Sequence, residues 1–208
     1  MTPRHLFIAP ASAPSLRWTE AFPGASVISG HEPVPPGDER HTIIWLCTCN
    51  DDWRDVLMRL RGDQPDRHVV VMSMRPQQNE GLAALELGAR GYCHALSAPV
   101  LLREIGEVIA RDGLWVGPEL LQRLITLLQP HLPRRSADEV LKGLSERETA
   151  VARLVAAGHS NKEVARRLGI TERTVKAHLS SIFGKLGLRD RLQLALRLGR
   201  NDAGPTLH

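Results

Sequence analysis

The sequence predicts a two-part chain, in which an α/β doubly wound five-stranded parallel sheet is followed by an all-α, four-helix helix-turn-helix domain. In the first part, five short apolar runs alternate with stretches of helical periodicity. In the last part, helix-capping residues recur at the spacing of short helices. Charge separates the two parts: residues 141–208 hold thirteen Lys or Arg and six Asp or Glu, a net charge of +7, whereas residues 1–140 hold fourteen and seventeen, a net charge of −3.

The apolar runs of the first part have the length of strands. We expect strands at His5–Ala9, Ser26–Ser29, Thr42–Cys47, His68–Ser73 and Gly91–His94. Helices are expected at Ser12–Ala21, Asp52–Arg61, Asn79–Leu87 and Pro99–Asp112. Between the second and third strands, Pro33, Pro35 and Pro36 disfavour a helix, so a loop is expected there. This alternation predicts a parallel sheet whose functional residues follow the carboxyl ends of its strands.

In the last part, each expected helix begins at a residue that can cap it. The starts are Ser145 (a capping box with Glu148), Ser160 and Thr171, and Gly158 and Gly169 suit left-handed stops. In the third of these helices, apolar residues recur on one face, at Val175, Leu179, Ile182 and Leu186. The opposite face is cationic. A basic helix on a compact helical unit is suited to a DNA groove.

The segment from Leu144 to Leu188 resembles the C-terminal DNA-binding domain of the LuxR/NarL class of bacterial transcription regulators. The matching runs are LSERE from Leu144, GHSNKEVARRLGI from Gly158 and TERTVKAHLSSIFGKLGL from Thr171. The resemblance implies a transcription regulator that binds double-stranded DNA. It also implies a fourth helix at Arg189–Gly199. A homodimer is expected, either through this helix or through a face of the first domain, and pairing through this helix would space operator half-sites by about 10 bp.

The resemblance also implies which side chains would contact DNA. The third helix would enter the major groove with Lys176, Ala177 and Ser180 nearest the base edges, and Arg173 and Ser181 would share its outward face. Phosphate contacts would come from Ser160, Asn161, Lys162, Thr171, Thr174 and Lys185. Gly184 is a departure from the family pattern inside the third helix. Glycine there should make the helix about 1 kcal/mol less stable than alanine would.

The first part resembles a response-regulator receiver domain. The runs GLAALELGARGY from Gly81 and LLREIGEVIARDGLWVGPEL from Leu101 carry this resemblance. A phosphorylatable receiver holds Mg²⁺ with an acidic pair after strand one and with the aspartate after strand three that accepts the phosphoryl group. A lysine after strand five pairs with the phosphoryl oxygens, and a Ser or Thr after strand four responds to them.

Most of these positions are substituted in this chain. No Asp or Glu precedes Glu20, so the acidic pair is missing. The acceptor position is Cys47 and the lysine position is Ala95, in a first domain that holds no lysine. Only the switch-like Ser73 and Tyr92 match the pattern. We therefore expect a domain that is not phosphorylated on aspartate and that acts through dimerisation, a small-molecule ligand or a protein partner.

The expected domains are a receiver-like domain at residues 1–116, a linker helix and hinge at 117–140, and a helix-turn-helix domain at 141–208. The apolar run Pro118–Gln129 predicts the linker helix, which could pack on either domain or on a second subunit. A polar hinge is expected at Pro130, Pro133, Arg134 and Arg135.

Cysteine usage favours a reducing, cytoplasmic location, because three cysteines give no disulfide framework. Pro3 and Arg4 oppose a signal peptide, and no run approaches the roughly 20 apolar residues of a membrane span. No paired ligand spacing predicts a metal site, and no cofactor is expected. On a strand Cys47 and Cys49 would share a face, so a thiol-based redox-sensing regulator is an alternative to inert buried cysteines.

Two other function classes are alternatives. The chain could be an interaction or adaptor protein whose first domain binds another regulator. It could also be a thiol enzyme using Cys47, but no base and orienting group accompany that thiol in the sequence. We therefore expect no enzymatic activity.

Overall fold

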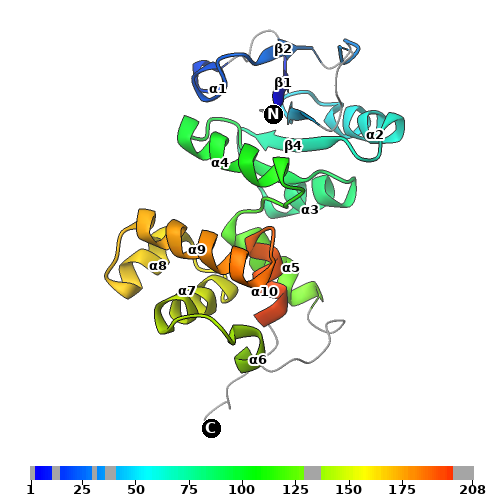
Figure 1. Cartoon of the computed structure of the whole chain (residues 1–208). Helices are drawn as coiled ribbons and strands as arrows, with labels where there is room; N and C mark the ends of the chain where they lie inside the picture. Colours follow the sequence, from blue (N-terminus) through cyan, green and yellow to red (C-terminus); the bar gives the residue numbers. More distant parts are fainter. Residues whose placement is uncertain (1–2, 11–14, 30–31, 36–40, 129–136, 199–208) are drawn as a thin grey trace. The chain divides into compact units, whose positions relative to one another are not determined.

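The computed structural model describes residues 3–10, 15–29, 32–35, 41–128 and 137–198 (Figure 1). The chain divides into two compact units, residues 1–116 and 117–208, each with its own hydrophobic core. Among the described residues, no helix is long and apolar enough to cross a membrane.

The first unit contains the predicted five-stranded parallel sheet, with strand order β2-β1-β3-β4-β5. The strands are β1 (Arg4–Ile8), β2 (Ser26–Ile28), β3 (Thr42–Cys47), β4 (His68–Ser73) and β5 (Gly91–His94). All residues of β3 and β4 are buried, as expected for the central strands of a sheet that is covered on both faces. The predicted strand positions are therefore confirmed to within a residue at their ends.

Helices cover this sheet as a doubly wound fold requires. They are α1 (Leu16–Ala21), α2 (Trp53–Asp63), α3 (Gln78–Glu86) and α4 (Pro99–Ala110). The helices α1 and α4 pack against each other and share one core cluster with β1, β3, β4 and β5, while α2 packs on β3 and α3 on β5. The described residues 32–35 between β2 and β3 carry no helix, in agreement with the prolines there.

Aromatic stacking forms the centre of this core. The Phe7 ring lies 4.8 Å from the Trp18 ring and 5.5 Å from the Trp45 ring, and both pairs are stacked. All three side chains are fully buried. Each such pair contributes about 0.5–1.5 kcal/mol beyond its area burial. Trp18 and Trp45 are therefore core residues.

The second unit is helical. It contains α5 (Pro118–Leu128), α6 (Ala137–Leu141), α7 (Glu146–Ala156), α8 (Asn161–Leu168), α9 (Glu172–Leu186) and α10 (Arg191–Leu198). The predicted caps are present: Ser145 and Ser160 each form a complete capping box, and Gly169 takes the left-handed conformation at φ 64°. The helices α7, α8 and α9 pack on one another around Val151, Val164 and Val175, and α10 packs on α7.

The segment 117–140 contains two helices that pack on the helical unit. The helix α5 packs against α10, and α6 adds Ala137 and Leu141 to the helical core. The α5 helix buries Leu120, Leu121 and Ile125, and a helix with that apolar stripe gains more from packing than from serving as a free spacer. The expected hinge residues Pro130, Pro133, Arg134 and Arg135 lie outside the described residues.

Candidate nucleic-acid interface

The longest helix of the second unit, α9, is held firmly at both ends and along one face. Its N-cap Thr171 accepts a hydrogen bond from the Thr174 backbone N–H at 3.1 Å, and Gly187 ends it with a φ of 64°. Its buried side chains are Val175, Leu179 and Ile182. Gly184 is tolerated inside this helix. The opposite face of α9 is consequently presented in a fixed orientation.

Most of the side chains predicted to contact DNA are on α9, outside its buried stripe. Among those on α9, Thr174 and Lys176 are half-buried, and the exposed ones are Arg173, Ala177, Ser180, Ser181 and Lys185. Cationic side chains stand beside small ones on this face. Small side chains allow the helix backbone to approach a surface closely, while long cationic side chains reach further.

The start of α8 supplies a second group of predicted contacts. Ser160 Oγ accepts from the Glu163 backbone N–H at 3.3 Å, and the Glu163 carboxylate accepts from the Ser160 backbone N–H at 2.7 Å. The Ser160 hydroxyl also donates to that carboxylate at 2.8 Å, and this bond, followed by the one from the Ser160 backbone N–H, holds the pKa of Glu163 below its ordinary value. Lys162 is exposed, and Asn161 is half-buried with its Oδ1 lacking a hydrogen-bond partner among the described residues. Ser160 thus has a local structural role in addition to the predicted one.

Glu148 links α7 to α9 and engages two of the predicted DNA contacts. Its buried carboxylate accepts hydrogen bonds from Lys185 Nζ, Ser181 Oγ and the Ser145 backbone N–H, each at 2.7 Å. The Lys185 ammonium, together with the two hydrogen bonds, lowers the pKa of Glu148 to about 2. Lys185 and Ser181, which the resemblance placed at DNA, are therefore bound to an internal carboxylate in this structure.

Several arginines of the second unit bind backbone carbonyls. Arg147 donates to the Leu168 carbonyl at 2.8 Å, and Arg197 donates to the Leu186 carbonyl at 3.1 Å. These carbonyls lie at the ends of α8 and α9, where helices leave acceptors unsatisfied and favour positive charge. Part of the positive excess therefore stabilises the helical unit itself, and the sequence shows no signal that separates these arginines from those facing outward.

Comparison with known proteins assigns the family. Residues 142–198 match the family described as "Bacterial regulatory proteins, luxR family". The glycerol metabolism activator of Pseudomonas putida is 30% identical over 153 residues, which are 70% of this chain and 67% of that protein. The chain belongs to the LuxR/NarL family.

The chain is also similar to proteins named as response regulators. The nitrate/nitrite response regulator protein homolog of Haemophilus influenzae is 31% identical over 144 residues, 66% of this chain and 63% of that protein. The matched regions thus span about two thirds of these relatives' lengths. The crystal structure of response regulator ChrA, from a heme-sensing two component system, is 21% identical and covers 93% of this chain and 94% of that chain, with a TM-score of 0.43.

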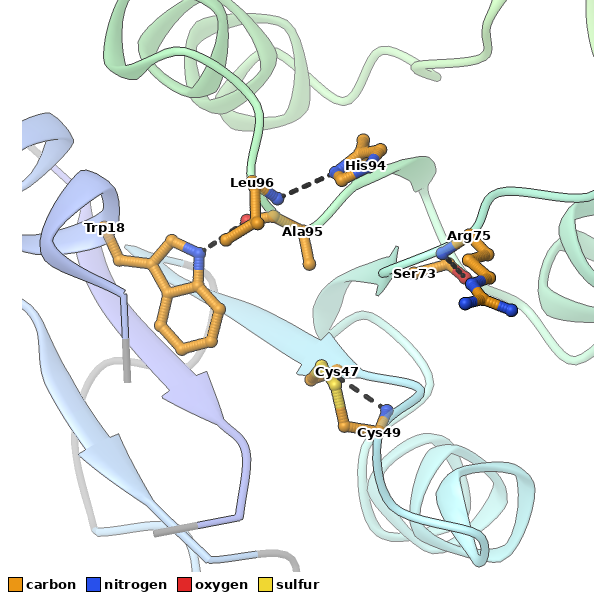
Figure 2. The surroundings of a disulfide bond; sticks show 8 residues. All are labelled: Trp18, Cys47, Cys49, Ser73, Arg75, His94, Ala95 and Leu96. Atoms are coloured by element: carbon orange, nitrogen blue, oxygen red, sulfur yellow. Dashed lines mark hydrogen bonds between the residues drawn. A yellow bond between two sulfur atoms is a disulfide. The ribbon is translucent and has the colours of Figure 1, made fainter. Parts of the chain in front are cut away.

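In this LuxR/NarL-family protein, the residues that the receiver resemblance placed at the acceptor site, Cys47 and Ala95, are buried in an apolar cluster together with Ala9, which follows the first strand. Ala9, Cys47 and Ala95 are at most 1% exposed and lie in one hydrophobic cluster. The Trp18 indole Nε1–H donates to the Ala95 carbonyl at 2.7 Å, so that its ring lies beside the Ala95 backbone (Figure 2). Among the described residues, no group of three His, Cys, Asp or Glu could hold a metal ion.

The cysteines correct two expectations. Cys47 ends β3 and is buried, whereas Cys49 lies in the following turn and is exposed, so the two do not share a strand face. A disulfide joins them across Thr48, although the cysteine count predicted no disulfide framework (Figure 2). The Cys49 backbone N–H also donates to Cys47 Sγ at 3.4 Å. Cys93 is a free thiol, and burial raises its pKa to about 12.

Ser73 and Tyr92, which the resemblance placed at a receiver's switch, bond to the connection between β4 and α3. Ser73 is buried, and its Oγ accepts from the Arg75 backbone N–H at 3.2 Å. Tyr92 OH accepts from the Gln77 backbone N–H at 2.8 Å and donates to Glu80 Oε1 at 2.6 Å. Burial and the Glu80 carboxylate raise the pKa of Tyr92 to about 12. The Tyr92 ring is held inward by these bonds.

Proposed function

We propose that this LuxR/NarL-family protein is a sequence-specific transcription regulator that reads DNA with α9. The observation that carries this proposal is the two-faced character of α9, which buries three apolar side chains and turns a cationic face outward. The major groove admits an α-helix, and each base pair presents a distinct pattern of donors and acceptors there. Lys176 can donate to guanine O6 and N7, and the short side chains of Ala177 and Ser180 permit close approach.

Phosphate contacts would fix the position of α9 in the groove. Lys162 and Arg173 are exposed cations at the starts of α8 and α9, where the helix N-termini also favour an anion. Thr171, Thr174, Ser160 and Asn161 complete the proposed set. Lys185 differs from these residues, because its ammonium is already paired with Glu148. It therefore contributes less to phosphate binding and more to holding α9 on α7.

We also propose that the receiver-like unit acts without aspartyl phosphorylation, through dimerisation, a ligand or a protein partner. Phosphoryl transfer needs an acceptor carboxylate and Mg²⁺ held by further carboxylates. At the corresponding positions this chain has Ala9, Cys47 and Ala95 in an apolar cluster. Such a cluster would solvate neither a carboxylate nor Mg²⁺. The adaptor alternative differs in one respect, since its basic unit would bind DNA without selecting a sequence.

Selection from fragmented genomic DNA at fixed salt tests the proposal. The intact protein should recover a defined set of fragments, and Lys176→Ala should lose that selectivity. Lys142→Ala is the matched control, because it removes the same charge from an exposed position of the same unit that lies outside α9. If Lys176→Ala recovers the same fragments as the control, the assignment of α9 to the groove is wrong.

A further inference from the structure

Cys47 and Cys49 lie on either side of the point where β3 leaves the sheet, at the position of a receiver's acceptor. We propose that they form a reversible thiol–disulfide site, and that its redox state is the input signal of the first unit. The existence of this site is independent of DNA binding. Its role as an input rests on the proposed function.

The two cysteines differ in solvent exposure, as a pair made of a reacting thiol and a resolving thiol requires. Cys49 is exposed in the turn, so a small oxidant can reach its sulfur. Cys47 is fully buried at the end of β3, yet its sulfur bonds to that of Cys49. The Thr48 backbone N–H donates to the Met72 carbonyl at 2.8 Å and keeps the intervening residue attached to β4. The exposed thiol is therefore the first to react, and the buried thiol resolves the product.

A purely structural purpose explains this disulfide poorly. A cross-link stabilises a fold mainly by restricting the unfolded chain, and the effect grows with the length of the closed loop. Here the linked residues are two positions apart in sequence. In addition, Cys47 already lies in a continuous apolar cluster with Trp45 and Met72, which does not need a covalent link to Cys49 to form.

The chemical step uses a peroxide as the oxidant. The Cys49 thiolate attacks one oxygen of hydrogen peroxide, the S–O bond forms, the O–O bond breaks, and the leaving hydroxide takes up a proton to become water. The Cys47 sulfur, losing its proton, then attacks the Cys49 sulfenic acid; the S–S bond forms and the S–O bond breaks, releasing a second water. Two electrons pass from the two thiols to the peroxide. A dithiol reductant returns them by thiol–disulfide exchange.

The disulfide sits where its formation can change the local backbone. The linked turn leads directly into α2, whose first residue Trp53 donates its N–H to the Asn50 carbonyl at 3.1 Å. Closing the ring restricts the backbone around Thr48, and opening it releases that restriction. The redox state therefore changes how tightly the backbone of the β3–α2 connection is restrained.

Counting thiols in the full-length protein tests the site. After reduction with dithiothreitol, a maleimide mass tag applied in denaturant should add to all three cysteines. After hydrogen peroxide it should add only to Cys93, with Cys47 and Cys49 linked within one chain, and dithiothreitol applied to the native protein should restore all three tags. Three tags after peroxide, a link between two chains, or a link that resists dithiothreitol would each overturn the proposal.

Variants separate the pair from the third cysteine. Cys49→Ser changes an exposed position and should abolish the intramolecular link without disturbing the core, whereas Cys47→Ser places a hydroxyl in the core and tests folding as much as chemistry. Cys93→Ala is the control, because it removes the third, buried thiol without placing a hydroxyl in the core, and it should still form the link. If Cys49→Ser still loses two tags under peroxide, the pairing is wrong.

The input role is tested on a duplex recovered by the genomic selection. Oxidation should change the affinity of the wild type and of Cys93→Ala for this duplex by about five-fold or more, the lower end of typical coupling between sites. Cys49→Ser should not respond. Equal affinities of the oxidised and reduced wild type would overturn the input role. Because the thiol count needs no DNA, a failure of this proposal is distinguishable from a failure of DNA recognition.

Discussion

The carboxylate of Glu148, in the first turn of α7, accepts a hydrogen bond at 2.7 Å from the ammonium of Lys185, near the end of α9. The same carboxylate closes the capping box with Ser145, so one buried group fixes the start of α7 and its position against α9. The orientation of the proposed reading face therefore depends on a charge that lies behind it.

Glu148→Gln should destabilise the second unit at neutral pH. The folded pKa of about 2 lies below the ordinary value of 4.5, so this carboxylate contributes stability that is fully present above about pH 4.5 and is lost as the pH falls toward 2. In urea unfolding followed by circular dichroism, the variant should be less stable than the wild type at pH 7, and the difference should shrink on acidification. Glu146→Gln, in the same first turn but exposed, is the control. A constant difference at all pH values would contradict the account.

Lys162→Ala and Lys185→Ala should differ in how salt affects DNA binding. Each phosphate contact contributes about 0.9 to the slope of log affinity against log salt. Lys162 is exposed, so its removal should lower the slope by about that amount. Removing Lys185 should lower it less, because Glu148 already neutralises much of that charge. The measurement is a fluorescence anisotropy titration at several salt concentrations, and equal slopes for the two variants would refute the division of roles.

Substitutions at Ser160 should separate helix capping from DNA contact. Ser160→Ala removes the side-chain acceptor of the capping box and should lower the free energy of unfolding by about 1 kcal/mol. Ser160→Asp keeps an acceptor at the cap but adds a negative charge beside the proposed phosphate contacts. Its stability should stay close to that of the wild type while its DNA affinity falls. Wild-type affinity in Ser160→Asp would remove this serine from the interface.

Leu121→Ala should destabilise the second unit, because α5 packs against α10 within it. Truncating this fully buried leucine should cost about 2–5 kcal/mol. All four tryptophans lie in residues 1–116, so circular dichroism should show the loss while the tryptophan fluorescence transition stays unchanged. Leu127→Ala, on the same helix and 55% exposed, should have little effect. A shift of the fluorescence transition in Leu121→Ala would contradict the assignment of α5 to the second unit.

The first unit should remain unmodified by a small phosphodonor. Incubation of the full-length protein with acetyl phosphate and Mg²⁺ should yield no acid-stable, base-labile acyl phosphate, because Cys47 replaces the acceptor carboxylate and the surrounding cluster is apolar. Intact-mass spectrometry before and after hydroxylamine treatment reads this directly. An acyl phosphate on any residue of the first unit would overturn the claim that aspartyl phosphorylation is absent.

Local patterns predicted most of the fold. Strand positions followed from short apolar runs, and the starts of α7, α8 and α9 followed from Ser145, Ser160 and Thr171, because capping depends on residues within one helical turn. The packing of α5 on α10 could not be predicted from local patterns. An apolar stripe predicts that a helix will pack but does not identify its partner.

The sequence predicted the candidate site less well where two bonded side chains are far apart in the chain. The family resemblance placed Lys185 at DNA, but the carboxylate that binds it lies 37 residues earlier and is recognisable locally only as part of a capping box. The disulfide was missed for a related reason. A strand extended through Cys49 would leave the two thiols side by side, whereas β3 ends at Cys47 and the turn brings the sulfurs together.

Methylation protection on a selected duplex tests the central claim most directly. Dimethyl sulfate methylates guanine N7 in the major groove and adenine N3 in the minor groove, so one experiment distinguishes the two grooves. If α9 reads the major groove, the protein should protect guanine N7 at one or more positions of each half-site, and Lys176→Ala should lose that protection. Protection confined to adenine N3, or guanine protection unchanged in Lys176→Ala, would contradict the account.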